Sequence, residues 1–138
     1  MTSATDDDRL AIRELLQRYA RGVDSRDLAL VASCFTSNAS YRGALAQGTV
    51  ADALAALPDA MARYTATRHT ITDHAAEVTG DTAHSTAACT ARHWMPTGGC
   101  RVVGVRYRDE LARGADGWRI TRRDVEALWS RDDEEEAP

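Results

Sequence analysis

Three side chains that can carry or move protons fall on the apolar face of predicted strands: His69, His93 and Asp109. Imidazole titrates near neutral pH, so a histidine beside a carboxylate can take a proton from one atom and deliver it to another. A carboxylate on an apolar face is costly unless it is hydrogen-bonded, so Asp109 needs a partner. His93 would make a second acid–base pair with Asp109, whereas Arg122 or Arg123 would make a structural ion pair.

The strands that carry these side chains are predicted for the second half of the chain, where short turn signals separate runs of alternating polarity. In residues 101–111 the odd positions are mostly apolar and the even positions mostly charged, so the odd positions point inward. His93 shares the inward parity of its own strand. The expected strands, which form an antiparallel meander, are Arg68–Val78, Ala83–Met95, Cys100–Arg113 and Trp118–Leu128.

The first of these strands has a break in its alternation. His69 points inward with the odd positions, whereas Ala76 points inward with the even ones. A β-bulge between about Thr72 and Ala75 would reconcile the two halves. Without a bulge, His74 would replace His69 on the inner face.

The first half of the chain is predicted to be helical. Apolar residues recur at helical spacing from Leu10 to Val23, and a second, shorter stripe runs from Leu28 to Phe35. Asp24 lies between the two stripes, where it either caps the second helix or takes a role in a pocket.

Residues 36–38 are predicted to form a turn and residues 39–42 a short strand. A third helix is expected after Thr49, with Pro58 breaking or kinking it. Helices followed by strands indicate an α+β fold, with the helices packed on one face of a curved sheet.

Length and composition restrict the class of protein. The 138 residues, with 43% hydrophobic and 28% charged residues, fit one globular domain at 6–129, with disordered ends at 1–5 and in the acidic segment 130–138. No apolar run is long enough to span a membrane, and no secretory signal is recognisable. A net charge of −4 without a basic stripe argues against nucleic-acid binding. The cysteines lack metal or disulfide spacing, which favours a reducing cytoplasm: Cys34, Cys89 and Cys100.

Several short strings, in order, resemble SnoaL-like domains of the nuclear transport factor 2-like superfamily over about residues 6–128. These strings are AIRELLQRYA at 11–20, VDSRD at 23–27, CF at 34–35, RHTITDH at 68–74, GDTA at 80–83, YRDEL at 107–111 and GWRI at 117–120. The resemblance implies a cone-shaped fold, in which a strongly bent, mostly antiparallel sheet wraps around helices and a pocket opens at one end. The superfamily includes scytalone dehydratase-like and bile-acid dehydratase-like lyases, ketosteroid isomerases, polyketide cyclases and proteins of no known activity.

The resemblance also implies site residues. Tyr19, Asp24 and His69 resemble the Tyr/Asp/His set of bile-acid dehydratase-like members. His69 and His93 resemble the two pocket histidines of scytalone dehydratase-like members, in which Tyr41 is similar to a pocket tyrosine.

Asp109 occupies the position at which SnoaL-like cyclases keep a strand carboxylate. The predicted catalytic residues are therefore Asp24, His69, His93 and Tyr19. The predicted substrate-binding residues are Tyr41, Asp109, Tyr107 and Arg123.

The elimination of water next to a carbonyl group needs a base, an acid and a donor for the enolate oxygen. His69 with Asp24 could supply the first two, and Tyr19 or Tyr41 the third. We therefore expect a lyase of the dehydratase type, or an isomerase or cyclase, that uses no cofactor or metal and acts on a mostly apolar, ring-containing or polyketide-like molecule. The alternatives are a non-catalytic ligand-binding or dimerising module, a cofactor-free oxygenase or epoxide-opening enzyme, and a metal site built from His69, His93 and Asp24.

The same strands predict how the chain assembles. Val102, Trp94 and Ala88 are apolar residues at positions of outward parity. Exposed apolar patches of this kind usually mark an interface, so we expect a homodimer that forms through the sheet.

Overall fold

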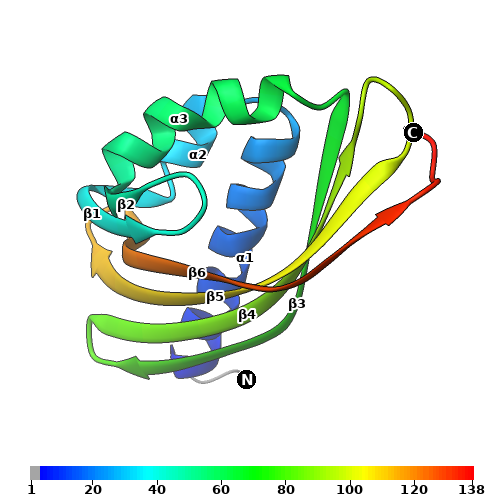
Figure 1. Ribbon diagram of the computed structural model, residues 1–138. Helices are drawn as coiled ribbons and strands as arrows, with labels where there is room; N and C mark the ends of the chain where they lie inside the picture. The colour runs from blue at the N-terminus through cyan, green and yellow to red at the C-terminus, as the bar shows by residue number, and fades with distance from the viewer. Residues whose placement is uncertain (1–3) are drawn as a thin grey trace.

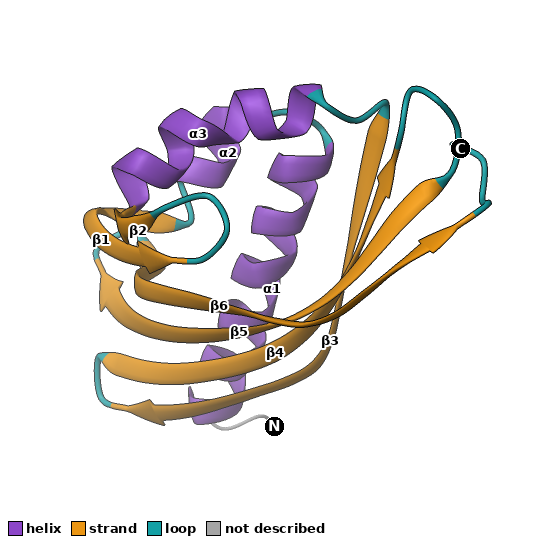
Figure 2. Ribbon diagram, viewed as in Figure 1, coloured by secondary structure: helices purple, strands orange, loops and turns teal. Residues whose placement is uncertain are grey.

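The computed structural model describes residues 4–138, and this part of the chain forms three helices and six strands (Figures 1 and 2). The elements, in chain order, are α1 (Ala4–Asp24), α2 (Leu28–Ala32), β1 (Phe35–Arg42), β2 (Gln47–Thr49), α3 (Val50–Ala62), β3 (Ala66–Thr79), β4 (Thr82–Trp94), β5 (Cys100–Gly114) and β6 (Gly117–Asp133). The α+β prediction is confirmed.

The strands form one curled sheet in the order β2-β1-β6-β5-β4-β3. β1 pairs parallel with β6, and the other neighbours pair antiparallel, so the predicted meander of the four long strands is confirmed. The sheet bends around α1, and α3 lies across one end of the curled sheet (Figure 1). This is the expected cone, with the helices on its inner side.

The predicted bulge in β3 is present. The register with β4 shifts between Thr72 and Ala75, and Asp73 has a positive φ of 51°. The extra residue changes the parity of the strand, so Ala76 is buried in the core while His69 also faces inward. The bulge therefore determines which side chains of β3 reach the interior.

Two details of the predicted elements are wrong. The second helix ends at Ala32, and the predicted turn at 36–38 lies inside β1, because the chain pairs with β6 from Phe35 onward. This pairing with a strand far along the sequence outweighs the local turn preference. The third helix is not broken at Pro58, which was one of the two outcomes expected there: it continues to Ala62, because buried residues on both sides of the proline, including Leu57 and Met61, hold it against the core.

The predicted disordered ends are also revised. β6 continues to Asp133 and pairs with β5 as far as Cys100, so residues 130–133 are part of the sheet. Beyond the strand, Glu135 accepts a hydrogen bond from Arg92 of β4 (3.2 Å). At the other end, α1 already includes Ala4 and Thr5, and the rest of the predicted disordered segment lies outside the described residues.

The apolar patch expected on the outer face of the sheet is not exposed. Trp94 and Val102 are 4% and 0% exposed within the single chain, where they form a small second cluster with Cys100 and Ala66. The prediction of an exposed patch at these residues is therefore wrong. The main core lies between the helices and the inner face of the sheet.

Among residues 4–138, no helix is long and apolar enough to cross a membrane.

Candidate active site

An aspartate–histidine pair joins the end of α1 to the first part of β3. Oδ1 of Asp24 lies 2.7 Å from Nδ1 of His69, and Oδ2 accepts a hydrogen bond from the His69 backbone N–H (2.8 Å). The side chains are 23% and 10% exposed, respectively. The structure thus brings these two predicted residues into direct contact.

Asp24 does not cap the second helix, which was the alternative role for it. The cap is Asp27, whose carboxylate accepts a hydrogen bond from the Leu30 backbone N–H (3.0 Å). Since the capping position is filled three residues later, both carboxylate oxygens of Asp24 remain directed at β3.

Asp24 is held in its ionised form. Burial alone would raise the pKa of its carboxyl group, but the hydrogen bonds from the His69 ring, the His69 backbone and Thr67 outweigh burial and lower the pKa. An ionised Asp24 accepts a hydrogen bond from the Nδ1–H group of His69. The tautomer inferred from this contact leaves Nε2 of His69 unprotonated and able to act as a base.

Two residues that the sequence interpretation missed support Asp24. The Thr67 hydroxyl donates to Oδ1 of Asp24 (3.0 Å) and accepts from the Arg26 guanidinium (2.9 Å). Arg26 also donates to the Val23 carbonyl (3.0 Å), and its φ of 61° lies in the left-handed region. Because Thr67 accepts from Arg26, its own proton is directed at Asp24, and the carboxylate is fixed from two sides.

His93, on β4, lies beside the Asp24–His69 pair. Its ring centroid is 5.9 Å from that of His69 and 4.8 Å from that of Tyr64. Nδ1 of His93 lies 3.2 Å from the Arg101 carbonyl, which fixes the proton on Nδ1 and leaves Nε2 as the free ring nitrogen. Burial lowers the pKa of His93, so this ring is neutral at neutral pH.

The two histidines line a cavity of about 550 Å³. Tyr19, Tyr41 and Tyr107 line it as well, and most of the remaining wall is aliphatic and comes from α3 and the inner face of β5 and β6. These wall residues include Leu57, Met61, Val103, Val105 and Val125. The cavity therefore has a mostly apolar lining with a few polar groups, an arrangement that is typical of small-molecule sites.

The three tyrosines remain protonated donors. Burial raises the pKa of Tyr19, against the opposing effect of Arg123, and burial also raises the pKa of Tyr41 and of Tyr107. Tyr19 packs edge-on against the Tyr107 ring at a centroid distance of 6.0 Å. A buried phenol of this kind can donate a hydrogen bond to a substrate oxygen at neutral pH.

Asp109 and Arg123, two predicted substrate-binding residues, do not line this cavity. They form a bidentate ion pair with two contacts of 2.8 Å, and both side chains are fully buried. The guanidinium carbon of Arg123 lies 4.4 Å from the Tyr19 ring and 4.0 Å from the Tyr107 ring, and therefore packs against the faces of two cavity residues. Arg123 thus contacts residues of the cavity wall, and a substrate-binding role for Asp109 and Arg123 stays a prediction.

The other candidate partners of Asp109 are engaged elsewhere. Arg122 pairs with Asp124 at the surface, and Nδ1 of His93 faces the Arg101 carbonyl. Burial would lower the pKa of Arg123, but the adjacent Asp109 more than offsets this effect and raises it. Within the described residues, no three His, Cys, Asp or Glu side chains are grouped as metal ligands.

Comparison with known proteins agrees with this fold. A family model described as the SnoaL-like domain matches residues 5–124. The chain belongs to the SnoaL-like family. No protein with a curated description matches the sequence.

Solved structures share the SnoaL-like fold over almost the whole chain. A provisionally named aromatic ring hydroxylase from Novosphingobium aromaticivorans is 27% identical, with a TM-score of 0.82 and coverage of 91% of this chain and 93% of the other. A provisionally named scytalone dehydratase from the same species is 14% identical, with a TM-score of 0.86 and coverage of 100% and 94%. The hexachlorocyclohexane dehydrochlorinase LinA-type3 from Novosphingobium barchaimii is 20% identical, with a TM-score of 0.74 and coverage of 92% and 93%.

Proposed function

We propose that the protein is a cofactor-independent enzyme that removes a proton from a carbon atom next to a carbonyl group, in a dehydratase-type elimination or a related isomerisation or cyclisation. One observation carries this proposal. His69 lines a mostly apolar cavity of about 550 Å³, and its Nδ1 lies 2.7 Å from Oδ1 of Asp24. A neutral imidazole oriented by a carboxylate is a general base suited to work near neutral pH.

The elimination proceeds by one proton shuttle. Nε2 of His69 takes the α-proton, and the electrons of the C–H bond form an enolate, whose oxygen accepts a hydrogen bond from Tyr19 or Tyr41. The enolate then expels the β-hydroxyl group, which takes the proton from the His69 imidazolium and leaves as water. Asp24 stabilises the imidazolium while it exists. In an isomerisation, the imidazolium returns the same proton to a different carbon atom.

The cavity supports a mostly apolar, ring-containing substrate. Its aliphatic and aromatic wall favours the burial of an apolar ring, and its volume is within the range of small-molecule sites. His93 contributes a second neutral imidazole next to His69, and its free Nε2 would accept a hydrogen bond from a hydroxyl group of the substrate.

The same observations argue against a purely structural module. In such a module we would expect Asp24 to cap α2 over a filled core, but Asp27 is the cap and Asp24 contacts His69. The neighbouring structures whose names include dehydratase and dehydrochlorinase are 14% and 20% identical, so their likeness shows the fold alone. The 27% identical neighbour is named as an aromatic ring hydroxylase. The assay below therefore also tests for cofactor-free oxygenation.

The test is a turnover assay with a panel of cyclic β-hydroxy ketones. Turnover is measured as the increase in absorbance of the conjugated product. We expect turnover of at least one compound, and a loss of at least about a hundredfold in Asp24→Asn and His69→Ala. Asp27→Asn is the matched control, because asparagine also caps helices well, and it should keep wild-type turnover.

A folded Asp24→Asn protein with near-wild-type rates would refute the acid–base role. Ligand binding without turnover of any panel compound would favour the binding module. Oxygen consumption, with hydroxylated products in place of eliminated ones, would favour the oxygenase.

A further inference from the structure

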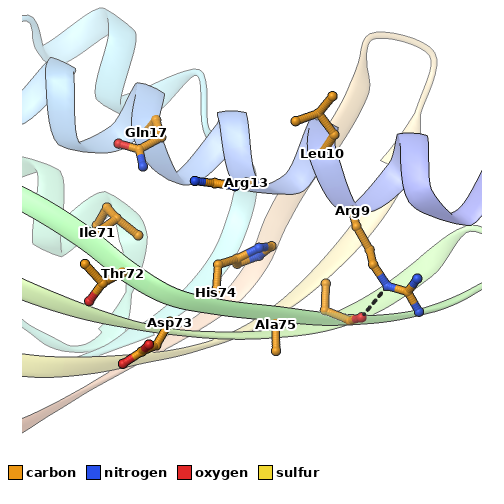
Figure 3. A pocket seen from close by; sticks show the side chains of 10 residues that line it. Arg9, Leu10, Arg13, Gln17, Ile71, Thr72, Asp73, His74 and Ala75 are labelled. Carbon is orange, nitrogen blue, oxygen red and sulfur yellow. Dashed lines mark hydrogen bonds between the residues drawn. The ribbon is translucent and has the colours of Figure 1, made fainter. Parts of the chain in front are cut away.

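A second cavity lies between α1 and β3, and none of its lining residues belongs to the Asp24–His69 cavity (Figure 3). It measures about 570 Å³. We call it the α1–β3 groove and define it by the residues that line it: Arg9, Leu10, Arg13 and Gln17 of α1, and residues 71–76 of β3. The acid–base chemistry proposed above uses none of them.

The bulge in β3 brings a histidine into this groove. After the shift at Asp73, the His74 ring is turned toward α1 (Figure 3). Nε2 of His74 lies 3.0 Å from the hydroxyl of Ser85, which is buried on β4. This contact anchors one ring nitrogen and leaves Nδ1 available to a ligand.

The charges that face the groove are mainly positive. Arg13 makes no hydrogen bond or ion pair with any residue in the described range 4–138. Arg9 is fixed by hydrogen bonds to the Ala76 carbonyl (3.0 Å) and to Asp6 (3.2 Å). The carboxylate among the lining residues, on Asp73, is directed away from α1 (Figure 3).

The pKa of His74 is lowered. Burial is the largest cause, and the positive charge of the nearby Arg13 lowers the pKa further, whereas Asp109 has the opposite effect. The groove also has apolar surface. The apolar side chain of Leu10, on the α1 side of the groove, is 54% exposed, and Ile71 lies on the β3 side.

From this arrangement we infer that the α1–β3 groove binds a small organic molecule that carries one carboxylate or phosphate group. The anionic group pairs with the unpartnered guanidinium of Arg13, which can hold two oxygens of either group at once. Gln17 and the free nitrogen of His74 provide further hydrogen bonds. The apolar body of the ligand covers Leu10 and Ile71.

The test is an NMR titration of isotope-labelled full-length protein with benzoate and with phenyl phosphate, and with neutral benzamide as the uncharged analogue. We expect amide signals of Gln17 and of residues 71–76 to shift with at least one of the two anions and not with benzamide. The anion that binds more tightly identifies the group for which the groove is built.

Arg13→Gln should weaken this binding at least tenfold. Its fold should be unaffected, because Arg13 is exposed and has no hydrogen-bond or ion-pair partner among residues 4–138 to lose, and the amide spectrum of the variant verifies this. Arg21→Gln removes the same charge from the exposed last turn of α1 and should leave the binding unchanged.

Four results would overturn the inference: no shift with either anion up to millimolar concentrations, equal shifts with benzamide, shifts confined to residues around His69 and His93, or unchanged affinity in Arg13→Gln. Because the readout is binding to residues outside the Asp24–His69 cavity, its failure leaves the proposed enzyme activity untouched. If the protein does not turn over the β-hydroxy ketones, the inference that the α1–β3 groove binds an anion is likewise unaffected.

Discussion

Asp24 and Asp109 are both carboxylates held inside the cone, but their partners give them different chemistry. Asp24 is partly exposed and bonded to the imidazole of His69, a type of side chain that serves as a general acid or base in proteins. Asp109 is fully buried and bonded to Arg123, whose charge does not change in the accessible pH range. The first pair is suited to proton transfer, and the second to holding the tyrosine rings of the cavity wall in place.

Asp109→Asn is expected to destabilise the protein by roughly 3–5 kcal/mol, because it leaves Arg123 buried without its counter-charge. Urea denaturation measures the change. Asp124→Asn is the matched control, since its partner Arg122 is at the surface and its loss should cost about 1 kcal/mol or less. If Asp109→Asn unfolds like the wild type but has lost turnover, Asp109 belongs to the catalytic machinery instead.

His93 should make stability depend on pH. Its pKa in the folded protein is lowered, chiefly by burial, so below about pH 6.5 the unfolded chain takes up a proton that the folded chain resists. The free energy of unfolding should therefore be highest above about pH 6.5. It should decrease as the pH falls from there through the lowered pKa of His93 in the folded protein.

The His93→Gln variant should lose less stability than the wild type between about pH 7 and 5, as followed by urea denaturation at each pH. His84→Gln, at an exposed position of the same strand, is the control. Identical pH dependence in His93→Gln and wild type would contradict the assignment.

The sequence predicted that Asp24 and His69 act together, but it did not predict the residues that support Asp24. Asp24 and His69 could be predicted because their residue types, the strand parity and the family resemblance agree. Thr67 and Arg26 carry no such signal, since a strand threonine and a turn arginine are common at a surface. Their roles follow from the left-handed turn at Arg26, which places the guanidinium next to β3, and no pattern in the sequence specifies that contact.

At the scale of elements, the bulge in β3 positions both candidate sites. It keeps His69 on the inner face at the cavity, and it turns His74 into the α1–β3 groove. A one-residue change of register reverses the faces of a strand, so the bulge must be maintained for either site to exist.

Asp73→Gly should leave stability unchanged or raise it slightly, because glycine adopts the positive φ of this position without strain. Asp73→Val should destabilise by about 1–3 kcal/mol, since a β-branched residue is strained there. Thermal or urea unfolding of the two variants makes the comparison. Equal stability of the two would show that the bulge does not depend on the backbone conformation of Asp73.

The long strands β3 to β6 were predictable because alternation and turn residues are local signals, and each strand pairs with its neighbour in sequence. β1 was only partly predictable, because its pairing with β6 joins residues such as Phe35 and Ile120 that are far apart in the chain. The last part of β6 was missed for a related reason: its charged residues suggested a solvated tail, but their backbone pairs with β5, and Asp132 bonds to Arg101.

At the scale of the whole molecule, we propose that the protein forms a homodimer through the outer face of the sheet. The residues first expected to form this patch are buried, but Leu128 and Trp129 of β6 are 42% and 43% exposed. The Trp129 ring lies against Gly104 of β5, where even a Cβ atom would collide with it. The Arg131 guanidinium also lies 5.1 Å from the ring centroid. A partly exposed tryptophan packed in this way against a strand is suited to contact a second copy.

Trp129→Gln should shift the assembly toward monomer, whereas Leu10→Gln, which removes an exposed leucine from α1, should not. Light scattering at micromolar concentration reports the mass. A monomer mass for the wild-type protein would refute the proposal.

The position of β6 has a consequence for how the molecule is made. Of the six described strands, β6 is the last to leave the ribosome, yet it lies inside the sheet, between β1 and β5. Until it emerges, β1 lacks its parallel partner and β5 has an open edge, so the nascent chain can form the hairpins of β3 to β5 but cannot close the cone. Since contacts between distant residues form slowly, completion of the sheet should be the slow step of folding. Chains that stop before β6 would expose two unpaired strand edges and be prone to aggregation.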